Sequence, residues 1–94
     1  MSYVLSRSKR KNKKYSITTP DEKIIHFGSD IGKTFIDHGD ETVKKNWIAR
    51  HKTNKNFNKM SSGIFWSNNL LWNKPSLVES IKDVEKRFNI RIKL

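Results

Sequence analysis

The run Y-S-I-T-T-P-D-E-K-I-I-H-F at residues 15–27 decides the fold class of this chain. β-Branched residues alternate with polar ones over residues 15–19, and apolar residues resume over 24–27 before Gly28 interrupts them. Between the two segments, Pro20 and the polar residues after it are typical of a turn. We therefore expect a β-hairpin, with a short third strand around residues 34–36.

The pattern after the hairpin is helical. Asp40 is suited to cap a helix that runs through Lys52, because apolar residues follow it at helical spacing. A second helix is expected from about Ser62 to Trp72, where apolar residues lie around most of the circumference. That second helix should therefore be largely buried.

The strongest helix signal lies near the C-terminus. Ser76 and Glu79 form an S-x-x-E capping box, and an apolar stripe continues from there to Phe88. Residues 90–92 alternate again and predict a short final strand. The sequence thus predicts a small single α+β domain with an N-terminal β-hairpin, about three helices and a short C-terminal strand.

Upstream of the hairpin, the chain is basic. Residues 1–14 contain no acid and six cationic residues, Arg7, Lys9, Arg10, Lys11, Lys13 and Lys14. A run of this kind needs no fold of its own to lie along a polyanion. We therefore expect a flexible basic arm over residues 1–14 and a single domain over 15–94.

Length and composition narrow the functional classes. The 94 residues include 20 Lys and Arg, 9 Asp and Glu, and no cysteine, which gives a formal net charge of +11. Without cysteine the chain forms no disulfides, zinc fingers or iron–sulfur sites. No apolar stretch reaches the ~18–20 residues of a membrane span, and no secretory signal begins the chain. We expect a soluble protein that does not bind membranes.

Catalytic and metal-binding patterns are weak. The run G-S-D-I-G-K-T at residues 28–34 resembles a phosphate loop, but the Walker pattern has four residues between its glycines and this run has three. No two of the three histidines have i, i+4 spacing, and His51 is expected to pack beside Trp47 or to face a phosphate. We therefore predict a protein that is not an enzyme and has no metal or cofactor.

The remaining signal is positive charge interleaved with aromatic residues. Residues 42–78 again contain no acid, so the charge lies in two blocks that an acid-rich segment separates. The helix after Asp40 should turn Trp47 and Ile48 inward and its lysines outward. The residues predicted to bind nucleic acid are Arg7, Lys9, Arg10, Lys11, Lys13, Lys14, Lys45, Arg50, Lys52, Lys55 and Lys59.

Two alternatives stay open for these features. The lysines could be an ordinary solvated face, and the arm could be a nuclear-localisation signal. Phe65, Trp66 and Trp72 could stack on bases, but a domain of this size needs such side chains for its core, and the core is the favoured interpretation.

Several short motifs occur in order along residues 13–92. They are I-H-F-G at 25–28, W-I-A-R-H-K at 47–52, N-F-N-K at 56–59, G-I-F-W-S at 63–67, L-L-W-N-K-P-S at 70–76, S-I-K-D at 80–83 and R-F at 87–88. In this series the chain resembles the short, basic, uncharacterised proteins encoded by nucleocytoplasmic large DNA viruses. The resemblance implies a viral protein carried in the particle, and it brings no catalytic residues.

Charge and resemblance together predict a non-enzymatic viral accessory or virion protein. It would bind nucleic acid, DNA in the first place, without sequence preference and help to package a genome. The alternative is a minor capsid or scaffold protein that docks on acidic surfaces of other virion proteins. The expected location is the virion or the viral factory in the host cytoplasm, with the nucleus as a further alternative. The sequence indicates no oligomeric state.

Overall fold

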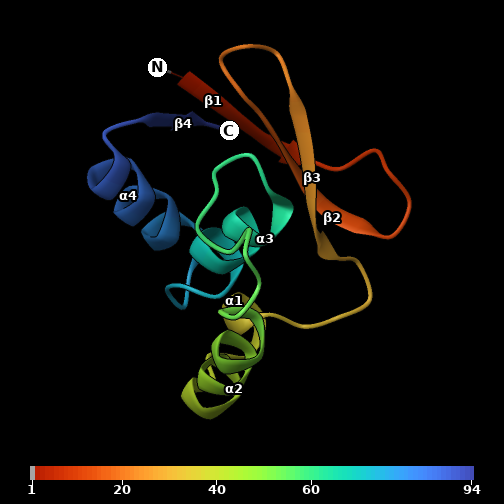
Figure 1. Ribbon diagram of the computed structural model, residues 1–94, viewed down its shortest axis with the longest axis vertical. Coiled ribbons are helices and arrows are strands. Elements are labelled where there is room, and N and C mark those ends of the chain that lie inside the picture. Colours follow the sequence, from red (N-terminus) through yellow and green to blue (C-terminus); the bar gives the residue numbers. More distant parts are fainter. Residues whose placement is uncertain (1) are drawn as a thin grey trace.

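A four-stranded mixed sheet forms one side of the molecule (Figure 1). The computed structural model describes residues 2–94, so Met1 of the predicted arm lies outside the described residues. The strands are β1 (Ser2–Arg7), β2 (Lys13–Thr18), β3 (Ile24–Ser29) and β4 (Arg91–Lys93), in the order β3-β2-β1-β4. β1 is antiparallel to β2 and parallel to β4, which brings the two ends of the chain into neighbouring strands.

The predicted hairpin is confirmed. β2 and β3 are antiparallel, and Tyr15 is paired with Phe27 in their register. The two rings lie 6.1 Å apart. Ile17 of β2 and Phe27 of β3 are buried, as the alternation of the sequence requires.

The flexible arm predicted for residues 1–14 is wrong for residues 2–7 and 13–14, which lie in strands, and residues 8–12 form the turn between them. Ser2–Arg7 is β1, and it lies between β2 and β4 in the sheet. Its core face carries Leu5, which is 3% exposed, and Tyr3, whose ring lies 5.5 Å from that of Trp66. The period of two in Tyr3 and Leu5 is the strand signal, and the following run of charge obscured it. The folded domain therefore includes the basic segment.

The short third strand expected around residues 34–36 is also wrong. Phe35–His38 is a short helix, α1, and Thr34 is its N-cap. The Asp37 carboxylate accepts the backbone N–H of Thr34 at 2.7 Å and its hydroxyl at 3.1 Å. These bonds to Asp37 hold a helical turn where β-branched residues suggested a strand.

The three longer helical segments occur where they are predicted. α2 (Glu41–His51) begins at Asp40, whose carboxylate accepts the N–H groups of Thr42 and Val43. The second segment is α3 (Gly63–Trp66), which continues as a π-helical turn, η1 (Ser67–Leu71). α4 (Leu77–Phe88) begins at Ser76, whose hydroxyl accepts the Glu79 N–H at 3.1 Å.

The π-helical turn has a local cause. The buried Asn69 side chain donates to the Phe65 carbonyl at 2.8 Å, in the position of a helical hydrogen bond. The Trp72 N–H then bonds the Ser67 carbonyl five residues back, at 3.1 Å. Arg87 of α4 donates to the Asn69 side-chain oxygen at 2.6 Å, so the turn is joined to α4.

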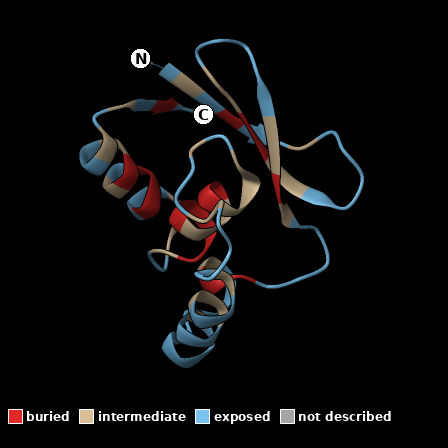
Figure 2. Cartoon of the chain, in the orientation of Figure 1, coloured by how far each residue is buried: buried red, intermediate tan, exposed pale blue. Residues whose placement is uncertain are grey.

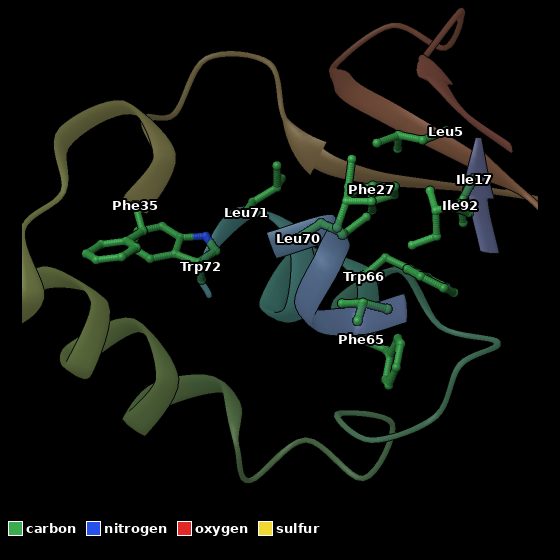
Figure 3. Packing of buried hydrophobic residues seen from close by; sticks show 12 residues of the cluster. Leu5, Ile17, Phe27, Phe35, Phe65, Trp66, Leu70, Leu71, Trp72 and Ile92 are labelled. Atoms are coloured by element: carbon green, nitrogen blue, oxygen red, sulfur yellow. The ribbon is translucent and has the colours of Figure 1, made fainter. Parts of the chain in front are cut away.

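The core lies between the sheet, the α3–η1 segment and α4 (Figures 2 and 3). Trp66 is fully buried, and its indole N–H donates to the Met60 carbonyl at 2.8 Å. Phe65 and Trp72 are buried as well, at 2% and 7% exposure, which confirms the core interpretation of these aromatic residues. Together the elements form one small α+β domain. None of the helices within residues 2–94 is long and apolar enough to cross a membrane.

Candidate nucleic-acid interface

α2 stands away from the sheet, and none of its residues is fully buried (Figures 1 and 2). A stack of rings attaches it to the rest of the molecule. Trp47 lies parallel to Trp72, 4.9 Å away and at an interplanar angle of 9°. His51 stacks on Trp47 at 4.2 Å, which is one of the two placements expected for it, and its Nδ1 lies 2.7 Å from the Trp47 carbonyl. This stack fixes one side of α2 against the core and leaves the other side open.

Lys44 is a second attachment of α2. Its ammonium group donates to the Asn73 carbonyl at 2.6 Å and lies 4.7 Å from the centre of the Phe35 ring. This lysine therefore points toward the core rather than outward. Val43, the residue before Lys44, remains 41% exposed.

A pocket of about 750 Å³ lies between α2, α3 and the strand ends of β2 and β3, and we call it the basic groove. Its cationic residues are Lys13, Lys33 and Arg50, and its histidines are His26 and His51. Its apolar residues are Phe27, Val43, Trp47, Ile64, Leu71 and Trp72. Among the described residues that line it, none is Asp or Glu. The groove therefore combines positive charge with an apolar floor.

The loop at residues 28–34 forms one wall of this groove. Gly28 has a φ of +79°, and a Cβ at this position would lie 2.8 Å from Leu71. Lys14 joins the loop to β2, because its ammonium group donates to the Gly32 carbonyl at 3.1 Å and pairs with Asp37 at 3.6 Å. The wall is thus held by glycine geometry and by the Lys14 side chain of β2.

The loop does not act as a Walker loop, in agreement with its spacing in the sequence. The N–H of Thr34, where a phosphate would bind, donates to the Asp37 carboxylate. This hydrogen bond, followed by that of the Thr34 hydroxyl and the charge of Lys14, holds the pKa of Asp37 below its ordinary value of 3.8. The carboxylate stays ionised and occupies the start of α1.

The turn between β1 and β2 reaches the same region. Ser8 and His26 are joined at 2.7 Å between the hydroxyl and Nδ1, which ties the turn to the β3 wall of the groove. Exposed cationic residues follow in the turn, namely Lys9, Arg10 and Lys11. Lys13 then enters β2 and lines the groove. The first basic block therefore leads directly into the groove.

The predicted binding residues fall into three groups. Lys13 and Arg50, from the two separate basic blocks, line the same groove. Lys14 is the member whose ammonium group is already bound by the protein. The others are exposed outside the groove: Arg7 at the end of β1, Lys9, Arg10 and Lys11 in the turn, Lys45 by a smaller pocket that contains Glu41, and Lys52, Lys55 and Lys59 after α2.

Sequence reasoning missed Lys33 and His26. Lys33 lies in the acid-rich segment of residues 21–41, and the loop containing it was considered only as a phosphate loop that departs from the Walker pattern. The position of Lys33 between Gly32 and the cap residue Thr34 was the signal in the sequence that could have indicated its role. No three His, Asp or Glu side chains within residues 2–94 lie close enough together to hold a metal ion.

Comparison with known proteins gives one match. The family model described as a family of unknown function (DUF5754) matches residues 3–51, which extend from β1 to the end of α2. The matched segment contains all three cationic residues of the groove, Lys13, Lys33 and Arg50. No curated protein and no solved structure matches the chain. The resemblance to proteins of large DNA viruses stays a prediction. Because the match spans more than half of the 94 residues, the chain belongs to this family of unknown function, DUF5754.

Proposed function

We propose that the protein binds nucleic acid through the basic groove and the adjoining β1–β2 turn, without catalysis and without a preference for base sequence. The observation that carries this proposal is the convergence of Lys13, Lys33 and Arg50, from three separate segments, on one groove with no carboxylate among the described residues that line it. Like charges gathered in this way repel one another unless an anion lies between them. The sugar-phosphate backbone of a nucleic acid supplies such anions at regular spacing.

The surroundings of the groove extend the same charge. The turn at residues 8–12 adds three exposed cations beside Lys13, and the formal net charge of the chain is +11. Each phosphate that these groups neutralise releases counterions, which favours binding at low salt. We propose that this binding serves the packaging of a viral genome, in the virion or in the viral factory.

Fluorescence anisotropy with labelled single-stranded DNA at about 50 and 200 mM salt tests the proposal, because phosphate contacts make affinity depend steeply on salt. The groove variant Lys13→Gln/Lys33→Gln/Arg50→Gln removes three charges from the groove. The control Lys82→Gln/Lys86→Gln/Arg91→Gln also removes three positive charges, but from exposed positions on α4 and β4.

Wild-type affinity should fall steeply with salt, and the groove variant should lose most of its binding while the control keeps most of it. Loss of three contacts should reduce the log–log salt slope by about 2, at ~0.7 per contact on a single strand. Equal losses in the two variants would show that only net charge matters. Binding that is indifferent to salt would contradict the proposal outright.

The second candidate is a minor capsid or scaffold protein that docks on an acidic protein surface. It is favoured by Ile31, which is 92% exposed in the loop next to Lys33. A protein surface can cover an exposed isoleucine with apolar groups, which a phosphate backbone does not offer. An Ile31→Ser variant would favour this candidate if it binds DNA as the wild type does but is no longer found in the shell fraction of purified particles.

A further inference from the structure

We infer that the basic groove takes an unpaired nucleotide, so that the protein binds single-stranded nucleic acid more tightly than duplex. This inference rests on the proposed function and specifies its ligand. The groove has two kinds of surface, and each must find a partner in the ligand. Its cations attract phosphate, and its apolar floor gains free energy only when it is covered by an apolar group.

A duplex satisfies only the cations. Its phosphates are accessible, but its base faces are stacked on one another and hidden from a protein surface. An unpaired nucleotide offers both a phosphate and a free planar base. The volume of the groove, about 750 Å³, lies within the ~300–1,000 Å³ of pockets that hold small ligands.

The floor indicates how the base would lie. Both faces of the Trp47 ring are covered, by His51 at 4.2 Å and by Trp72 at 4.9 Å. The base therefore contacts the end of this stack and the aliphatic groups beside it, Val43 and the half-buried Ile64. Apolar contact of this kind accepts every base, which agrees with binding that is independent of sequence.

The bound single strand of nucleic acid has a path out of the groove. Lys13 lines the groove and is continuous with the turn that carries Lys9, Arg10 and Lys11. Ser8 holds this turn against His26 of the groove wall. The neighbouring phosphates of a single strand can follow the turn while one base stays in the groove.

Val43→Phe tests the inference because it fills the groove without changing charge. Val78→Phe is the matched control, since Val78 is another exposed helical valine, 56% exposed, that does not line the groove. Gly32→Leu is a second filling variant, because a Cβ at Gly32 meets nothing closer than 3.8 Å. The probes are a labelled oligodeoxythymidine and a duplex of the same length, at about 50 and 200 mM salt.

The wild type should prefer the single strand by about tenfold, toward the lower end of what one contacted base contributes. This preference should persist as salt rises, because the apolar contact is not screened. Both filling variants should lose the preference, and Val78→Phe should keep it. Equal binding of the two probes by the wild type, or filling variants that keep the preference, would overturn the inference and leave the proposed function standing. Failure of the wild type to bind either probe would overturn both.

Discussion

Trp47→Ala should detach α2 from the core without unfolding the rest of the domain. No residue of α2 is fully buried, and Trp47 provides two ring contacts, with Trp72 at 4.9 Å and with His51 at 4.2 Å. Each aromatic pair contributes about 0.5–1.5 kcal/mol beyond the buried area. The pair with Trp72 joins α2 to the core and the pair with His51 stabilises the helix itself, so the substitution removes about 1–3 kcal/mol from the local stability of α2. The Lys44 hydrogen bond to the Asn73 carbonyl remains.

Native-state hydrogen exchange measures this loss locally. Since 1.4 kcal/mol is a factor of ten, exchange of the α2 amides should accelerate about tenfold to a hundredfold. The amides of α4 and of the sheet should keep their protection. Asn46→Ala, on the exposed side of the same helix, is the control and should change little. If α2, α4 and the sheet lose protection equally, Trp47 belongs to the global core and the reasoning is refuted.

Three further substitutions test the account. The hydrogen bond from Asn73, followed by that from Arg87, lowers the pKa of Asp83 below its ordinary value of 3.8. The stabilisation that the ionised carboxylate gives to the fold is therefore complete above pH 3.8, and it disappears as the pH falls through the lower pKa of the folded state. Asp83→Asn should thus lower the urea midpoint at neutral pH, and the difference from wild type should vanish in strong acid. Ser76→Ala removes the N-cap of α4 and should reduce the unfolding free energy by about 1 kcal/mol in urea titrations, whereas no change would deny the cap its role. Lys14→Gln should lower stability by less than about 1 kcal/mol and weaken DNA binding no more than Lys82→Gln does; a larger loss in anisotropy would make Lys14 a binding residue.

Local signals in the sequence predict most of the elements. The hairpin follows from alternation around a proline turn, and the starts of α2 and α4 follow from Asp40 and Ser76 at their N-caps. These features depend on neighbours within a few residues, so the sequence contains them explicitly. The burial of Phe65 and Trp66 follows from the need of a small domain for large apolar side chains.

The two errors have different causes. β1 pairs with β2, the next strand, and also in parallel with β4 at the other end of the chain, and this second partner is invisible to a local pattern. α1 depends on the cap that Asp37 gives to Thr34, in a segment whose β-branched residues indicate a strand. Tertiary pairing and a single side-chain cap overrode local propensity in these two places.

The groove itself needed the structure. The two basic blocks could be found from the sequence, but their meeting at Lys13 and Arg50 depends on the ring stack that places α2 beside the strand ends. Lys33 was hidden by nearby acids whose side chains do not line the groove. Charge counted along a chain predicts attraction to polyanions, and only the fold selects the cations that act together.

The most direct test of the central claim uses the three indole N–H signals in an NMR titration with a short oligodeoxythymidine. Trp47 and Trp72 line the basic groove, whereas Trp66 is fully buried and bonds the Met60 carbonyl. The account predicts that the signals of Trp47 and Trp72 shift with added strand, together with the amides of Lys33 and Arg50, while that of Trp66 stays in place. Shifts confined to α4, or equal shifts of all three indoles, would contradict binding in the groove.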